Sequence, residues 1–214
     1  MKISIKLIAI SILFFIVSCS SVTHVTGFWN EEAELRQTYK KVGIIAVTSY
    51  IQSRQAVESK FAERFRLNGY EAVECSKILT PEIMKRKDKN EIADILTKNN
   101  IDGFLIVSIL DIKESEHYVP GTTQYYPRTY YNNYYDYYYY QSDRIYTEGY
   151  YEKSVQIFLE SNFYNVNSEK LVSTIQTETA NPADVNDLAD SFSNTIVKVL
   201  IENGVIKKLP VKTE

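Results

Sequence analysis

The side chains best suited to catalysis or metal binding are scarce in this sequence. Its 214 residues include two His and two Cys, and the motifs G-x-S-x-G, H-E-x-x-H, C-x-x-C, G-x-G-x-x-G and the P-loop are absent from it. Glu114 and Glu116 would share one face of a strand while His117 points to the other face, so a metal would need ligands from elsewhere. A solvated strand end explains these three residues more simply. The sequence therefore predicts a protein that is not an enzyme and that holds neither a metal nor a cofactor.

The charged clusters also have simple structural roles. Asp184, Asp187 and Asp190 are spaced by three residues near the start of the last predicted helix, where the helix dipole and a solvated face favour acidic side chains. We interpret the run Lys85–Lys89 as a solvated loop, with contact to anionic lipid headgroups as the alternative. Lys and Arg number 24 against 27 Asp and Glu, whereas a nucleic-acid-binding protein would show a basic excess. We therefore expect no nucleic-acid partner.

The first residues combine the features of an export signal. Lys2 and Lys6 precede an apolar run of eleven residues, Leu7–Val17, which is shorter than the ~20 apolar residues that cross a bilayer. The run ends in Ile-Val-Ser-Cys at Cys19, and this pattern resembles the bacterial lipobox. The resemblance implies that Met1–Ser18 is removed and that Cys19 carries lipid, which anchors the chain in a membrane.

The lipobox resemblance also implies a location. Ser20 is not Asp, and in lipoproteins of enterobacterial type this permits sorting to the outer membrane. We therefore expect a chain that is lipid-anchored in the bacterial cell envelope, at the outer membrane and facing the periplasm. The alternative is an ordinary secretory signal that is cleaved after Ser20. With lipid on Cys19, Cys75 has no disulfide partner, and we interpret it as a buried structural thiol.

Strand and helix patterns alternate after residue 40. Continuous or alternating apolar residues predict five strands, and apolar stripes at helical spacing predict three helices. The strands are Val42–Thr48, Tyr70–Cys75, Phe104–Ile112, Thr147–Tyr164 and Lys170–Thr179; the helices are Arg54–Asn68, Asn90–Lys98 and a helix capped by Asn181 with Pro182 at its first position. The order β-α-β-α-β-β-β-α predicts an α/β fold, more narrowly an α+β sandwich, in which helices pack on a mixed β-sheet.

Two local features belong to the first predicted helix. Gly69 follows its last residue and is expected to end it, because glycine readily adopts the left-handed conformation found there. Arg54 and Glu58 form an i, i+4 pair near its start. Such a pair on a helix surface contributes only about 0.2–0.5 kcal/mol.

These patterns divide the chain into segments. We expect a lipoprotein signal peptide over residues 1–18 and a lipidated tether with a leading segment over 19–40. A single α/β domain is expected over 41–208, with a Tyr-rich insertion at 119–144. Residues 209–214 are then a short tail.

Tyrosine is concentrated in one segment. Of 18 Tyr residues, 14 lie between Tyr118 and Tyr151, and the connection Val119–Arg144 exceeds the ~12–15 residues usual within a compact domain. Its rings could stack on a glycan, contact a protein partner or drive self-association; an exposed loop without a role is the simplest alternative. We predict a contact surface made by Tyr125, Tyr126, Tyr130, Tyr131, Tyr134, Tyr135, Tyr137, Tyr138, Tyr139 and Tyr140.

Several segments together resemble a family of uncharacterised bacterial envelope lipoproteins. They include Gly69–Val73, Asp102–Val107, Tyr118-Val119-Pro120 before the Tyr-rich insertion, and the last helix with Gly204-Val205-Ile206 after it. The layout is more remotely similar to the amino-terminal domain of the Tol-system protein TolB and to the curli-secretion lipoprotein of the outer membrane. The resemblance implies an envelope location and this fold, and it implies no particular activity.

Two functions are therefore carried forward from the sequence. The first is a lipid-anchored envelope protein that acts as a non-catalytic binding or scaffolding module. In it the membrane holds the N-terminal lipid, and the Tyr-rich loop contacts an envelope protein or a glycan. The alternative is an oligomeric structural subunit of a secretion or surface assembly, in which the Tyr segment would order between protomers.

Overall fold

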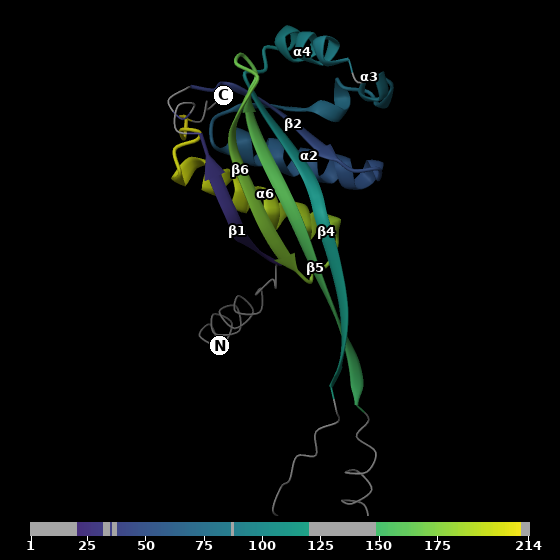
Figure 1. The fold of residues 1–214 in the computed structure, drawn as a ribbon. Helices are drawn as coiled ribbons and strands as arrows, with labels where there is room; N and C mark the ends of the chain where they lie inside the picture. The colour runs from purple at the N-terminus through teal and green to yellow at the C-terminus, as the bar shows by residue number, and fades with distance from the viewer. Residues whose placement is uncertain (1–20, 32–34, 36–37, 87, 120–148, 211–214) are drawn as a thin grey trace, which may run out of the picture. The chain divides into compact units, whose positions relative to one another are not determined.

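The computed structural model describes residues 21–31, 35, 38–86, 88–119 and 149–210. Within them the chain forms six strands, four α-helices and one short 3-10 helix (Figure 1). In chain order these are β1 (Val22–Asn30), β2 (Lys41–Val47), α2 (Ile51–Leu67), β3 (Glu71–Glu74), η2 (Cys75–Lys77), α3 (Pro81–Arg86), α4 (Lys89–Lys98), β4 (Gly103–Val119), β5 (Tyr150–Asn165), β6 (Lys170–Ala180) and α6 (Val185–Glu202).

The six strands form one mixed sheet in the order β1-β6-β5-β4-β2-β3. β2 is parallel to both β3 and β4, with Val42 opposite Ala72 on one side and Gly103 on the other. β1 is antiparallel to β6. Parallel neighbours need a crossover connection. α2 connects β2 to β3, and α3 with α4 then leads the chain from β3 to β4, on the other side of β2. The predicted mixed sheet and α+β sandwich are confirmed.

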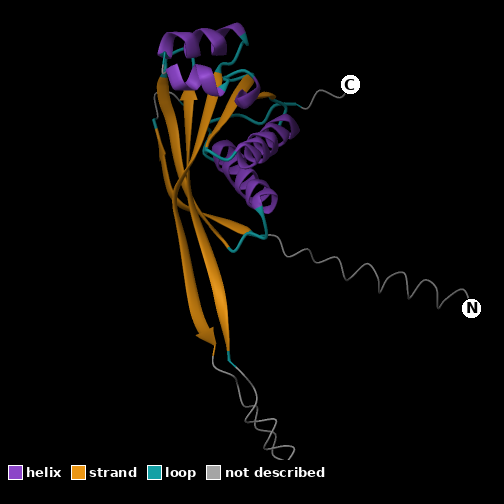
Figure 2. Cartoon of the chain, turned by 90° about the vertical axis from the view of Figure 1, so that its right-hand side faces the viewer, coloured by secondary structure: helices purple, strands orange, loops and turns teal. Residues whose placement is uncertain are grey.

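Helices cover the two faces of the sheet unequally. α2 and α6 lie on one face (Figure 2). Between them Phe61 and Phe192 meet edge to face, with ring centroids 5.2 Å apart. α4 lies at the end of the sheet on the other face, where Leu96 packs in a second cluster with Ile45. Ile44 belongs to the hydrophobic cluster that includes Phe61 and Phe192, and its neighbour Ile45 belongs to the second cluster, with Leu96. Successive side chains of β2 thus point to opposite faces, and both are buried, as its continuous apolar run predicts.

Strand β1 differs from the sequence prediction. A tether was expected over residues 19–40, yet Val22–Asn30 is a strand paired with β6. Thr23 is buried, and its hydroxyl lies 2.7 Å from that of Thr179 and 2.9 Å from that of Ser191 on α6. The alternation of β1 is hard to read because its register shifts between Val25 and Gly27, which moves the later side chains to the other face.

The last helix begins later than the sequence predicts. Asn181 was expected to cap it, but Asn181 has a positive φ of 46° and precedes a bend. Asp184 is the N-cap residue, and its carboxylate accepts hydrogen bonds from the N–H groups of Asn186 at 2.7 Å and Asp187 at 2.9 Å. Asp at this position satisfies two amides that have no partner within the helix. Pro182 therefore lies before the helix and not at its first position.

Gly69 ends α2 as predicted. Its φ is +87°, a conformation that glycine adopts at low cost. A Cβ at this position would also lie 2.6 Å from the backbone oxygen of Leu209, so the glycine allows the C-terminal segment to pass close to it. The Tyr70 hydroxyl next in sequence donates to the backbone carbonyl of Lys207. The segment after α6 is thereby fixed to the end of α2.

Residues 113–156 form a second compact unit, distinct from the unit made by the rest of the chain. Its described parts are the end of β4 and the start of β5. Tyr118 and Tyr151 face each other with ring centroids 5.1 Å apart. Lys153 Nζ lies 3.0 Å from Glu116 Oε1 in an exposed ion pair. Cross-strand pairs of this kind are the usual means by which two strands of a ribbon stay in register.

Candidate functional site

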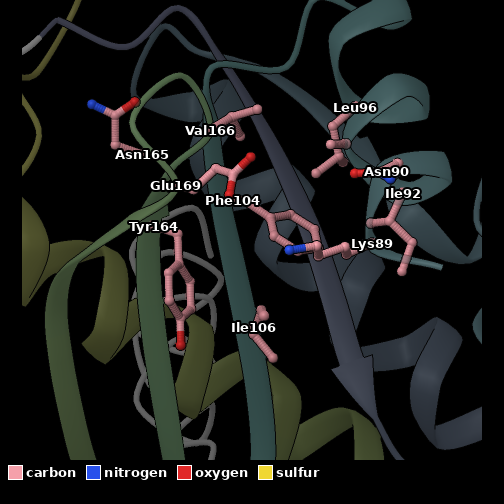
Figure 3. Close-up of a pocket in the computed structure, with 11 residues that line it drawn as sticks. Lys89, Asn90, Ile92, Leu96, Phe104, Ile106, Tyr164, Asn165, Val166 and Glu169 are labelled. Carbon is pink, nitrogen blue, oxygen red and sulfur yellow. The ribbon is translucent and has the colours of Figure 1, made fainter. Parts of the chain in front are cut away.

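The contact residues predicted in the Tyr-rich insertion lie outside the described residues, as does Cys19. The structure therefore does not test either prediction. A different candidate site lies within the described part of the chain. It is a pocket between α4 and the exposed face of β4 and β5 (Figure 3).

The pocket has a volume of about 280 Å³ and is mostly apolar. Its inner wall is formed by side chains that also contribute to the second core cluster, among them Leu96, Ile92 and Phe104. Polar groups stand around these apolar residues. The full lining comprises Lys89, Asn90, Ile92, Ala93, Leu96, Phe104, Ile106, Tyr164, Asn165, Val166 and Glu169.

The start of α4 positions one side of the pocket. Asp88 caps the helix by accepting hydrogen bonds from the N–H groups of Asn90 at 3.0 Å and Glu91 at 3.2 Å. This cap fixes the first turn, from which Lys89 extends toward Phe104 on β4 (Figure 3). Ile92 and Leu96 follow at helical spacing and face the sheet.

The turn between β5 and β6 positions the opposite side. The side-chain oxygen of Asn165 accepts hydrogen bonds from the N–H groups of Asn167 at 2.9 Å and Ser168 at 3.3 Å, which closes the turn. Glu169 adopts a positive φ of 59° in it. The Val166 N–H donates to the Asp102 carbonyl at 3.0 Å, so the turn is also joined to the start of β4.

Asp102 connects this end of the sheet to the segment before β2. Its carboxylate accepts hydrogen bonds from the N–H of Lys40 at 2.8 Å and from the N–H of Lys41 at 2.9 Å. Both bonds involve a charged acceptor, and such bonds are about twice as strong as neutral ones. The end of the sheet that carries the pocket is therefore held by charge-assisted hydrogen bonds.

This arrangement favours binding of an apolar group. A mostly apolar hollow with a few polar groups at its edge is the usual form of a small-ligand site. Among the described residues, no three side chains of the metal-binding types His, Cys, Asp and Glu are grouped closely enough to hold a metal ion. In the described part of the chain no helix is long and apolar enough to span a membrane.

The acidic residues singled out in the sequence have structural partners. The Asp187 carboxylate accepts from the N–H groups of Ala183 at 2.9 Å and Ser21 at 3.2 Å, and these hydrogen bonds lower its pKa. Asp190 pairs with Arg64 at 2.9 Å. With Asp184 as the N-cap, each of the three aspartates supports the start of α6 or its packing on α2. The structural interpretation of this cluster is confirmed.

Lys89 is a pocket residue that the sequence analysis missed. It belongs to the basic run that was interpreted as a solvated loop, and Arg86 in the same run does form an exposed ion pair with Glu91 at 2.7 Å. The sequence contained one usable signal: Asp88 is an N-cap residue, and it is followed three and four residues later by Glu91 and Ile92. Recognition of this cap would have placed Lys89 in the first turn of α4 and therefore beside its apolar face.

The Arg54–Glu58 pair is largely buried and is not a pair on the helix surface. Glu58 is fully buried, and its carboxylate accepts from Arg54 Nε at 3.0 Å and from the N–H groups of Ala46 at 3.1 Å and Ser76 at 2.8 Å. One carboxylate thus joins α2 to β2 and to η2. The expectation of a weak helix-surface pair was wrong, because periodicity alone does not show that the sheet covers this side of α2 at its start.

Cys75 is a buried structural thiol, as predicted. It is fully buried, and burial raises the pKa of its thiol to about 12. Its sulfur would lie 2.9 Å from a Cβ at Gly43, so strand β2 has a glycine where the thiol packs. A neutral thiol in this environment is unreactive.

No known protein-family model matches the chain. No curated protein matches it in sequence. Among solved structures it is similar to a PelC variant dodecamer from Paraburkholderia phytofirmans, with a TM-score of 0.43 and 9% identity over 84% of this chain and 97% of that chain. A second PelC dodecamer from the same organism gives a TM-score of 0.42 and 11% identity over 88% of this chain and 99% of that chain.

A lipoprotein is also among the similar structures. Lipoprotein GNA1162 from Neisseria meningitidis has a TM-score of 0.40 and 7% identity over 76% of this chain and 99% of that chain. Similarity at this level does not transfer a function to this chain.

Proposed function

We propose that this chain is a lipid-anchored, non-catalytic binding module of the bacterial cell envelope. The observation that carries the proposal is the sequence at Cys19, where a short apolar run ends in a lipobox-like Ile-Val-Ser-Cys. Several acyl chains on one cysteine give stable anchoring, whereas a single chain gives only marginal membrane binding. The proposed location is the outer membrane, facing the periplasm.

The contents of the described residues support a binding role. The acidic clusters serve helix caps and ion pairs, and Cys75 is buried and neutral. The pocket beside α4 offers a mostly apolar surface with a polar edge, and its lining contains no Ser, Cys, Thr or His. A site of this kind can hold a ligand but lacks an activated group to react with it.

Substitution of Cys19 tests the anchor. Cys19→Ala is expected to leave the signal uncleaved or to release the protein from the membrane fraction, and intact mass measurement of the unaltered protein is expected to show acyl chains. Cys75→Ala is the matched control, because it removes the other cysteine and leaves the lipobox intact. An unaltered protein without acyl mass would contradict the proposal.

Deletion of the Tyr-rich insertion tests the contact role. Replacement of residues 119–144 by a short Gly-Ser linker is expected to leave folding intact and to abolish co-purification of an envelope partner or binding to peptidoglycan. A second variant with the ten predicted contact tyrosines changed to Phe keeps the rings and serves as control. An unchanged set of partners after deletion would refute this surface as the contact site.

A second candidate function is favoured by strand β1. It lies at one edge of the sheet, and its exposed side chains include Val22 at 57%, Phe28 at 38% and Trp29 at 48%. An edge strand with exposed apolar side chains is suited to pairing with another chain. This favours a subunit of an oligomeric assembly. Native mass measurement of the detergent-solubilised protein distinguishes a stable ring-sized oligomer from a monomer.

A further inference from the structure

The sheet face opposite α2 and α6 carries an ordered set of polar side chains. Glu160 and Asn162 alternate on β5, and Thr174 and Gln176 alternate on β6. Thr174 Oγ1 donates to Asn162 Oδ1 at 2.6 Å, which joins the two strands. Glu160 accepts from Asn162 Nδ2 at 3.0 Å through one oxygen and from Gln176 Nε2 at 2.8 Å through the other. We name these four residues the polar quartet.

An indole ring lies beside the polar quartet. Trp29 is directly opposite Thr174 in the β1–β6 pairing, so the two side chains share this face. Gly27 is opposite Gln176, and a Cβ there would lie 3.2 Å from the Gln176 side-chain oxygen. The strand next to the quartet thus has one large exposed ring and, two residues before it, no side chain at all. The Trp29 ring therefore lies next to the polar quartet, and no side chain at Gly27 covers Gln176.

A second ring lies along β5. Tyr164 is two residues after Asn162 and therefore belongs to the same face. Figure 3 shows its ring along the strand, with the hydroxyl directed away from the turn that follows β5. Tyr164 also lines the pocket beside α4. The polar quartet is therefore bounded by Trp29 across the strands and by Tyr164 along them.

We propose that this face binds a neutral saccharide, with Trp29 as the stacking platform and the polar quartet as the hydroxyl-binding groups. The proposal concerns a site separate from the Tyr-rich insertion and does not depend on the lipid anchor. Each amide nitrogen of Asn162 and Gln176 uses one N–H within the quartet and keeps a second one, and Gln176 also has a carbonyl oxygen. Sugar hydroxyls both donate and accept, so they match this mixture.

Charge defines the class of saccharide. Glu160 is in the quartet, and its partners there are the neutral amides of Asn162 and Gln176. A carboxylate on this face repels a ligand that carries its own carboxylates or phosphates. The indole favours the apolar C–H face of a sugar ring, which neutral pyranoses have. An anionic polysaccharide is therefore a poor match for this face.

The experiment uses Trp29 as its own reporter, because it is the single Trp of the sequence. The intact protein is titrated with neutral oligomers of glucose and of N-acetylglucosamine up to millimolar concentrations, and with oligogalacturonate as the anionic comparison. We expect a saturable change in tryptophan emission with a neutral oligomer and none with oligogalacturonate. No saturable change with either neutral oligomer would overturn the proposal.

Substitutions within the face test whether the saccharide binds there. Gln176→Ala and Trp29→Ala, the latter followed by calorimetry, are expected to weaken binding about tenfold, which corresponds to the loss of one good contact. Tyr50→Ala removes an exposed ring elsewhere and is expected to have no effect. Unchanged affinity in Gln176→Ala, with folding verified by circular dichroism, would overturn the proposal. So would an emission shift that depends on protein concentration alone, since this would show a second copy on Trp29.

Discussion

Replacement of Glu58 should destabilise the protein strongly, although the residue pairs only four positions away with Arg54 on the same helix. Glu58 has no exposed surface, and Arg54 Nε lies 3.0 Å from its carboxylate in a pair that is largely shielded from water. The two backbone N–H donors belong to Ala46 on β2 and Ser76 on η2. Loss of the carboxylate therefore affects three elements together.

The expected cost follows from the groups left without a partner. In Glu58→Ala, two buried N–H groups lose their acceptor, at about 1–3 kcal/mol each, and the Arg54 guanidinium loses its counter-charge. Breaking a buried pair by removal of one partner costs about 3–5 kcal/mol, and because the two N–H groups also lose their acceptor we expect a total of at least that size. In Glu58→Gln the amide NH2 must face one of the two N–H groups, so about 1–3 kcal/mol is expected.

Urea unfolding followed by circular dichroism measures these differences. Glu202→Ala is the matched control, since it removes a glutamate from an i, i+4 pair with Lys198 whose side chains are 59% and 67% exposed. Such exposed pairs contribute about 0–1 kcal/mol. If Glu58→Gln were as stable as the control, the carboxylate would not support the two N–H groups, and the reasoning would be refuted.

Three further predictions concern other positions. Gly69→Ala should lower the free energy of unfolding by more than the ~1–2 kcal/mol of left-handed strain, because its Cβ would contact the Leu209 carbonyl. Gly204→Ala is the control, since Gly204 has a φ of +70° and open space around it and should show the strain alone. Equal losses in urea unfolding would contradict this prediction. Folded Cys75 has a pKa of about 12 and keeps its proton more tightly than the unfolded thiol. The free energy of unfolding should therefore fall as the pH rises above about 8.5, where the unfolded thiol ionises. If iodoacetamide alkylated the native protein as fast as the urea-unfolded chain, the thiol would not be buried. Ala93→Phe should fill the pocket beside α4 and weaken binding of the dye anilinonaphthalene sulfonate, whose aromatic rings bind apolar surfaces, roughly tenfold. Exposed Ala183→Phe should not weaken it. Equal dye affinity in both variants would place the dye elsewhere.

Much of the fold could be predicted because local and global signals agree in its central elements. β2 has the unbroken apolar run of a strand buried on both faces, and α6 has an apolar stripe that packs on β6 and α2. Gly69 ends α2 through a left-handed backbone conformation that glycine adopts more readily than other residues. In such places the sequence pattern and the packed structure carry the same information.

The errors occur where tertiary contacts outweigh the local pattern. β1 is an edge strand whose alternation is interrupted between Val25 and Gly27, so its sequence lacks the regular pattern by which a strand is recognised. Asn181 and Asp184 are both good caps, and their residue types alone do not decide between them. The burial of Glu58 depends on β2 and η2, which approach it from other parts of the chain.

The candidate sites were the least predictable features. Lys89 and Glu169 come together with Phe104 because a helix, a turn and a strand that are distant in sequence meet at one end of the sheet. The polar quartet likewise depends on the pairing of β5 with β6. Patterns in a single sequence describe one element at a time and do not show which distant elements come into contact.

If Cys19 carries lipid as proposed, the docking of Ser21 at the start of α6 would limit how far this domain can move from a membrane. The Ser21 N–H donates to the Asp187 carboxylate at 3.2 Å, and β1 begins at the next residue. Consecutive Cα atoms are 3.8 Å apart, so the Cα of a lipid-bearing Cys19 would lie no more than about 8 Å from that of Ser21. Where a long linker would let the domain sample a wide volume, this attachment would keep it at the bilayer surface. The domain could then bind only partners that lie within about one domain's depth of the bilayer surface. Residues inserted after Cys19 would extend the distance over which the domain can find a partner, without changing its affinity for that partner.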